Sequence, residues 1–184
     1  MKKMILAALV AVASISANAQ VWVGGSLGFN YNKNADDVKT TTFSIAPEVG
    51  YTLSDKWDIA IALEETNISQ KDGDSMNTFA VNPYARYTFF QTGKVGFFLD
   101  MGFNVATSNG IYAGGIVREL DDNTTEFGIG VRPGVKFAAS DKVTFVASLG
   151  QLGYRQIKNG DAKDNTFGLN VDGSALKFGV YYAF

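Results

Sequence analysis

Hydrophobic and polar residues alternate with a period of two along most of the chain. From Val21 to Tyr31 the odd positions are mostly apolar, and the even positions other than Trp22 are small or polar. This is the side-chain period of a β-strand, and about eleven residues are enough for a tilted strand to cross a lipid bilayer. Similar segments follow. Together they predict strands at residues 21–31, 42–53, 57–66, 78–90, 95–106, 126–138, 142–154 and 173–184.

Short and long connections alternate between these strands. The short ones are three-residue turns at 54–56, 92–94 and 139–141. The long ones are mostly polar loops at 32–41, 67–77, 107–125 and 155–172. No helical periodicity intervenes, which argues against a parallel βαβ sheet. The pattern predicts an all-β fold, an eight-stranded antiparallel up-and-down transmembrane β-barrel. Pro47 has no N–H for the ladder, so we expect a β-bulge there.

The two faces of the predicted strands differ in charge. The outward positions are nearly free of charged residues, whereas a soluble ligand-binding barrel would be polar outside and apolar inside. The inward positions hold many glycines and charges of both signs. Near mid-height these charges are Glu48, Glu64, Arg86, Asp100, Arg132 and Lys177, which we call the lumen charge network.

The lumen of an eight-stranded barrel is only wide enough to be filled by side chains. Charges placed there must pair with each other or hold water. We therefore expect the lumen charge network to plug the barrel, with a path for protons or small solutes as the alternative. If Gln91 pairs with Val95 across the turn at 92–94, Arg86 lies directly opposite Asp100 and both point inward.

The first 19 residues have the pattern of a secretory signal peptide. Lys2 and Lys3 form a basic segment, residues 4–15 are apolar, and Ala17-Asn18-Ala19 fits an A-x-A cleavage site. The apolar segment is too short for a membrane-spanning helix. We therefore expect export by the Sec pathway and a barrel domain over residues 20–184.

The composition removes several classes of function. The chain has no cysteine and no histidine, which excludes disulfides, Ser-His and Cys-His nucleophiles and His-dependent zinc sites. The formal net charge of −2 and the lack of a basic run argue against nucleic-acid binding. Acidic pairs fall in predicted loops, where solvation is a simpler explanation than Ca²⁺ binding: Asp36-Asp37, Asp72 with Asp74, and Asp121-Asp122. We expect no cofactor and no metal.

The last eight residues contain a further pattern. Phe178, Val180, Tyr182 and Phe184 fall on one side of the predicted strand. A polar residue is followed two positions later by Gly, and aromatic residues stand three and five positions beyond that Gly. This arrangement resembles the terminal assembly signal of bacterial outer-membrane barrels, and it is filled here by Lys177, Gly179, Tyr182 and Phe184.

Taken together, the signal peptide, the alternating strands, the charged lumen and the terminal Phe resemble the small bacterial outer-membrane β-barrel family of OmpA/OmpX type. The resemblance covers the whole mature chain. It implies an integral protein of the outer membrane of a Gram-negative bacterium, with outer-membrane lipids, lipopolysaccharide and the barrel-assembly machinery as partners. The same scaffold serves adhesins, membrane anchors, small pores and a few lipid-modifying enzymes.

Three functions therefore stay open. The one we expect is a non-enzymatic protein with a side-chain-filled lumen and exposed outer loops, in an envelope-structural or surface-interaction role. The second is a narrow porin-like channel for small solutes. The third is a lipid-modifying outer-membrane enzyme, for which the usual histidine base is missing. The sequence does not identify an extracellular ligand.

Overall fold

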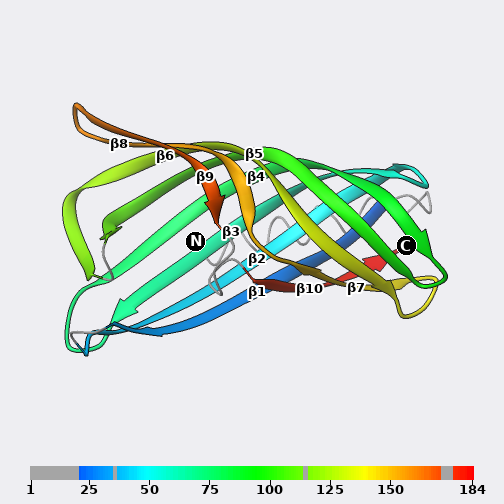
Figure 1. The fold of residues 1–184 in the computed structure, drawn as a ribbon, viewed down its shortest axis with the longest axis horizontal. Coiled ribbons are helices and arrows are strands. Elements are labelled where there is room, and N and C mark those ends of the chain that lie inside the picture. The colour runs from blue at the N-terminus through cyan, green and yellow to red at the C-terminus, as the bar shows by residue number, and fades with distance from the viewer. Residues whose placement is uncertain (1–20, 35–36, 114–115, 171–175) are drawn as a thin grey trace.

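A computed structural model describes residues 21–34, 37–113, 116–170 and 176–184. These residues form one antiparallel sheet (Figure 1). Its strands are β1 (Val21–Lys33), β2 (Lys39–Ser54), β3 (Trp57–Gln70), β4 (Ser75–Thr92), β5 (Val95–Ala113), β6 (Ile116–Ala138), β7 (Val143–Ser148), β8 (Gln151–Asn159), β9 (Ala162–Asn170) and β10 (Lys177–Ala183). Among the described residues, no helix is long and apolar enough to cross a membrane. The predicted signal peptide lies outside the described residues.

Eight of these strands close into a ring. Strands β1 to β6 pair consecutively, β6 pairs with β7, β7 with β10, and β10 with β1. The closing seam runs from Trp22 opposite Ala183 to Leu27 opposite Phe178, where β1 and β10 lie side by side in Figure 1. The predicted all-β antiparallel fold is therefore confirmed, and the predicted eight-stranded ring is found in part, because β1 and β10 pair only from Trp22 to Leu27 and β9 forms an edge of the sheet. We call the end with the short β2–β3, β4–β5 and β6–β7 connections the turn end, and the opposite end the loop end.

The seventh predicted strand is interrupted at Leu149 and Gly150. Lys136 of β6 pairs with Val146 of β7, whereas Gly130 pairs with Gly153 of β8, so one extra residue lies between the two ladders. Gly150 has a φ of 74°, a left-handed conformation that glycine adopts at little cost. Because of the extra residue, even positions face inward in β7 and odd positions face inward in β8. This shift explains why the alternation blurs after Gly150.

The loop end contains more strand than the sequence predicts. The region 155–172, predicted as a loop, holds most of β8 and all of β9, which form a hairpin projecting beside β6 in Figure 1. The region 107–125 is also mostly strand, because β5 continues to Ala113 and β6 begins at Ile116. In these two regions apolar residues do not recur at every second position over a full strand length, so the period-two signal is lost. The predicted start of the last strand, at residue 173, lies outside the described residues.

The turns differ in detail from the predicted three-residue turns. In β4–β5, Thr92 pairs with Val95 across the two-residue turn Gly93-Lys94, and Gly93 has a φ of 53°. The predicted pairing of Gln91 with Val95 is wrong. The β2–β3 turn is likewise two residues long, at 55–56, and residues 139–142 join β6 to β7.

The β-bulge predicted at Pro47 is also wrong. Strands β1 and β2 stay in one register from end to end, and Gly25 faces Pro47 without a shift. The ladder from β2 to β3 omits Ala46 and Pro47 and resumes in the same register at Glu48 opposite Ala62. The missing N–H therefore interrupts one ladder locally but does not bend the strand register.

The outer surface of the ring is apolar and the side chains alternate as predicted. Large outward residues such as Phe29 and Phe178 are 67% and 60% exposed, whereas the inward Trp22, Phe98 and Tyr181 are buried. A continuous exposed apolar belt around a barrel is the surface that a lipid bilayer covers. The inward positions, and not the outer surface, therefore form the core of this protein.

Candidate functional site

Large side chains fill the lumen at the turn end. Trp22, Phe98, Val146 and Tyr181 form a buried cluster, in which Trp22 stacks on Tyr181 with ring centroids 4.4 Å apart. A Cβ atom on Gly134 would lie 2.2 Å from the Phe98 ring, so this inward glycine is needed for the ring to lie across β6. Glycines on one strand thus make room for aromatic rings from the neighbouring strand.

Arg86 and Asp100 form a buried two-pronged ion pair directly above this cluster. The Arg86 Nε donates to Asp100 Oδ1 at 2.7 Å, and Nη2 donates to Oδ2 at 2.9 Å. The Arg86 side chain is 4% exposed, and its Cζ lies 3.9 Å from the centroid of the Phe98 ring. Such bidentate, charge-assisted bonds are among the strongest that side chains form.

The predicted pairing of Arg86 opposite Asp100 is confirmed, although the turn that was expected to produce it is different. Thr88 pairs with Phe98, and the next pair is Phe90 with Phe97, so Phe89 is an extra residue on β4. This bulge compensates for the shorter turn. The register at Arg86 is therefore the one the sequence predicts.

Glu48 is bound by hydroxyl groups. The hydroxyls of Tyr84 and Tyr181 donate to Glu48 Oε2 at 2.6 and 3.1 Å, and Ser26 Oγ donates to Oε1 at 3.0 Å. Arg86 Nη2 also donates to the Tyr181 hydroxyl at 3.3 Å. Tyr181 thus connects Glu48 to the Arg86–Asp100 pair. Sequence reasoning from charged residues missed these three hydroxyl residues, although each stands at a position that is predicted to face inward.

A second ion pair lies closer to the loop end. Lys177 Nζ contacts Glu64 Oε1, and Asn82 Nδ2 donates to Glu64 Oε2 at 3.1 Å. Asn104 Nδ2 then donates to Asn82 Oδ1 at 2.6 Å. This chain of contacts joins the terminal strand β10 to β3, β4 and β5 across the lumen.

Arg132 is the sixth member of the predicted lumen charge network, and its surroundings differ. It lies opposite Asp100 in the β5–β6 ladder. No described residue forms a hydrogen bond with its guanidinium or an ion pair within 4.0 Å of it. The structure thus brings five of the six predicted charges into direct contacts with other side chains, and leaves Arg132 facing open space.

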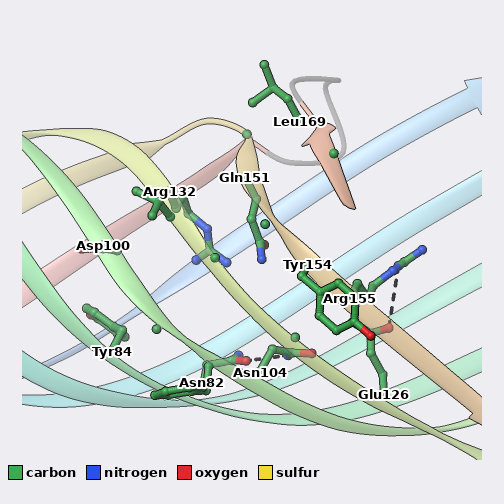
Figure 2. A pocket seen from close by; sticks show the side chains of 18 of the residues that line it. Asn82, Tyr84, Asp100, Asn104, Glu126, Arg132, Gln151, Tyr154, Arg155 and Leu169 are labelled. Carbon is green, nitrogen blue, oxygen red and sulfur yellow. Dashed lines mark hydrogen bonds and ion pairs between the residues drawn. The ribbon is translucent and has the colours of Figure 1, made fainter. Parts of the chain in front are cut away.

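That space is a cavity of about 490 Å³ in the loop-end half of the lumen (Figure 2). Polar side chains from β4, β5, β6 and β8 surround it, and Figure 2 shows Arg132 and Gln151 pointing into it from adjacent strands. At its rim, Arg155 Nη1 lies 3.7 Å from Glu126 Oε2.

At the loop end, Ile68, Met76 and Val117 form a small buried apolar cluster that sequence reasoning missed.

The terminal pattern is divided between the two faces of β10. Tyr182 and Phe184 lie on the outer surface, with their rings edge to face at a centroid distance of 5.3 Å. Lys177 points into the lumen, and Gly179 is buried where an added Cβ would lie 2.8 Å from Val146 Cγ2. Lys177 therefore belongs both to the terminal pattern and to the lumen charge network.

The acidic loop pairs do not assemble a metal site within the described part of the chain. No group of three or more His, Cys, Asp or Glu residues there is arranged to hold a metal ion. Asp37 forms an ion pair with Lys33, and Asp74 Oδ2 accepts a hydrogen bond from the Glu119 N–H at 3.3 Å. Asp36 lies outside the described residues.

The chain is similar to a known protein family and to solved structures. The family described as outer membrane protein beta-barrel domain matches residues 4–184. No curated protein sequence matches the chain. Neisserial surface protein A (NspA) is similar in structure, with 20% identity, a TM-score of 0.56 and coverage of 89% of this chain and 97% of that chain.

Two further solved structures are similar over 91% of this chain and 100% of their own chains. The N-terminal beta-barrel domain of Pseudomonas aeruginosa OprF has 16% identity and a TM-score of 0.47. The Yersinia pestis outer membrane protein Ail has 14% identity and a TM-score of 0.45. At these identities the similarities concern the fold.

The Arg86–Asp100 pair makes a direct prediction about stability. Asp100→Ala leaves a buried guanidinium without its carboxylate, so it should destabilise the folded barrel by about 3–5 kcal/mol. The double variant Arg86→Leu with Asp100→Leu should be much closer to wild type, because no unpaired charge remains. Glu126→Ala removes a carboxylate from the rim pair and serves as a control, with an expected loss below about 1 kcal/mol.

The free energy of unfolding would be measured for all three variants by urea titration in lipid bilayers, with tryptophan fluorescence as the signal. Equal destabilisation by the single and the double variant would show that the ion pair does not act as a unit.

Proposed function

Because the chain belongs to the outer membrane protein beta-barrel domain family, we propose that it is a non-enzymatic barrel with a closed lumen, in an envelope-structural or surface-interaction role. It is a protein of the Gram-negative outer membrane, and its apolar outer face is in contact with lipids and lipopolysaccharide. The proposal concerns what the barrel does there.

The observation that carries the proposal is the packed layer at the turn end of the lumen. Phe98 is 0% exposed, and Arg86 is held between Phe98, Asp100 and the Tyr181 hydroxyl. A solute would have to displace this bidentate ion pair and the stacked Trp22 and Tyr181 rings to pass. Such a lumen supports an anchoring role, with the loop-end strands as the contact surface.

The proposal includes an orientation and a processing route. We place the turn end and both ends of the mature chain in the periplasm, and the loop end outside the cell, as in barrels with short periplasmic turns. Residues 1–19 are the removed signal peptide of the Sec pathway, and residues 20–184 are the barrel domain. The loop-end extensions of β5, β6, β8 and β9 would then project outward.

A narrow channel is the second candidate, and the 490 Å³ cavity is the observation in its favour. The cavity lies on the loop side of the Arg86–Asp100 pair, with Asp100 in its wall. The barrel would conduct only if the packed side chains at the turn end, among them Trp22, Phe98 and Tyr181, moved aside. A lipid-modifying enzyme has less support, because the chain offers no histidine as a base.

We also propose that Lys177, Gly179, Tyr182 and Phe184 are the signal that the barrel-assembly machinery reads. The outward edge-to-face pair of Tyr182 and Phe184 supports this role, because it lies at the end of the strand that pairs with β1 at the closing seam. In this proposal the barrel-assembly machinery recognises the terminal strand, and the contact of Lys177 with Glu64 then stabilises that strand in the folded barrel.

Deleting Phe184 should therefore reduce the yield of folded outer-membrane protein severalfold while leaving export unchanged. Heat-modifiability on gels and the amount in the outer-membrane fraction give the measurement. Phe29→Ala is a matched control, since it removes another exposed outward aromatic residue, on the adjacent strand β1. A normal folded yield after the deletion, or an equal loss in the control, would contradict the assembly role.

The closed lumen is tested by planar-bilayer recordings of the purified, folded mature protein. We expect no large, stable conductance. The double variant Trp22→Ala with Phe98→Ala removes two rings that lie over Gly50 and Gly134, and it should increase the current if it folds. A steady porin-like current from the folded wild-type monomer would refute the closed lumen and favour the channel.

A further inference from the structure

We propose that the loop-end half of the lumen is a binding pocket for a small molecule that carries a carboxylate or a phosphate group, and that Arg132 binds this group. The inference stands on the geometry of the 490 Å³ cavity. It does not depend on the anchoring role, because a closed turn-end layer and an occupied loop-end pocket are separate features of the same barrel.

The charges of the cavity wall favour an anionic ligand. Each charged residue in the wall other than Arg132 is paired. The pairs are Glu64 with Lys177, Asp100 with Arg86, and Glu126 with Arg155. Arg132 is therefore the charge in this described wall that has no counter-ion in contact with it. An arginine that faces a partly enclosed polar space attracts an oxyanion, which its planar fork of donors fits in a bidentate manner.

The carboxylates near Arg132 are already bonded to other side chains. Asp100 lies between Arg86 on β4 and Arg132 on β6 in the ladder, and Arg86 takes both of its oxygens. The two oxygens of Glu64 accept from Lys177 and Asn82. The N–H donors of Arg132 are thus left for a ligand.

The cavity wall also contains a buried acceptor that has no donor. Asn104 Oδ1 is buried in the cavity wall and accepts no hydrogen bond, although its Nδ2 donates to Asn82. A buried acceptor without a donor is uncommon in folded proteins and costs stability. Because this oxygen has less than 1 Å² of accessible surface, a ligand N–H or O–H group would reach it only if the Asn104 side chain, shown beside the cavity in Figure 2, turned inward, so the choice of an anion rests on Arg132.

The cavity also has room for such a molecule. Its volume of about 490 Å³ lies within the usual range of about 300–1,000 Å³ for small-molecule pockets. The wall is lined by glycines, among them Gly128 and Gly168, and no heavy atom lies within 4 Å of a Cβ built on Gly168. Gly168→Phe would therefore project a ring into open space and would reduce the volume without touching Arg132.

The experiment is a calorimetric titration of the folded mature protein in a neutral detergent, with inorganic phosphate and succinate as probes. We expect binding of at least one probe. Arg132→Gln should weaken it about tenfold or more, since one charge-assisted hydrogen bond contributes roughly 1.5–3 kcal/mol. Arg132→Lys should retain part of the affinity, and Gly168→Phe should abolish it.

Lys136→Gln is the matched control. It removes one cation from the same strand, but its side chain lies beside Gly96 near the turn end and outside the cavity wall. Binding should be unchanged in this variant. Equal weakening by Lys136→Gln and Arg132→Gln would mean that the anion responds to net charge only, and would overturn the proposal.

A second arm identifies the source of the anion. The protein would be reconstituted in nanodiscs of phosphatidylglycerol or of phosphatidylcholine, and bound lipid would be counted by native mass spectrometry. Retention of phosphatidylglycerol by the wild type, and its loss in Arg132→Gln, would assign a lipid headgroup. Binding of phosphate or succinate without retained lipid would assign a free solute. Binding of neither would refute the site.

Folding stability separates this role from a structural one. Because Arg132 has no bonded partner, Arg132→Gln should fold normally and unfold at the same urea concentration as the wild type. A loss of stability comparable to that of Asp100→Ala would show that Arg132 belongs to the structural plug, and would contradict its assignment as a free ligand-binding group.

Discussion

The structure depends on one constraint, which is that charges enclosed in a narrow ring of eight strands must be neutralised there. Arg86 meets this constraint with Asp100 from the next strand, and Lys177 meets it with Glu64 across the lumen. Glu48 is stabilised differently, by three hydroxyl donors. A carboxylate that has enough donors needs no cation of its own. The charges therefore hold strands together that are distant in the sequence, β10 with β3 above all.

Glycine and aromatic residues solve the related problem of volume. Rings from one strand lie over glycines of its neighbour, as Trp22 does over Gly50 and Phe98 over Gly134. We propose that this packing seals the turn end, whereas the glycine-lined loop end keeps a cavity. In this proposal one barrel combines a sealed half, which suits an anchored surface protein, with a half that retains room for a ligand. The proposed roles of the two halves rest on this division.

The sequence predicts the ring because alternation along a strand needs only local information. The pairing of Arg86 with Asp100 is predicted because both residues stand at inward positions of two strands joined by a short turn. The prediction is right although the turn is shorter than expected, because the bulge at Phe89 restores the register. Pro47 shows the reverse case, in which a local rule predicts a bulge that the ladder between β1 and β2 does not contain. The β8–β9 hairpin escapes prediction because residues 158–166 are mostly polar and the extra residue near Gly150 reverses which positions of β8 face inward. The lack of a bonded partner for Arg132 could not be predicted. Its even position shows that the side chain points inward, but it does not show whether Arg86 or Arg132 binds the Asp100 carboxylate.

The most direct test of a lumen sealed around a buried ion pair is the exchange of the Arg86 side-chain proton with water. In arginine-labelled protein in lipid nanodiscs, the Nε–H of Arg86 should give a resonance that exchanges slowly with solvent, because it is donated to Asp100 at 2.7 Å in a side chain that is 4% exposed. The Nε–H of Arg155, whose side chain is 55% exposed, should exchange rapidly. Equally rapid exchange of the two protons would contradict a sealed lumen.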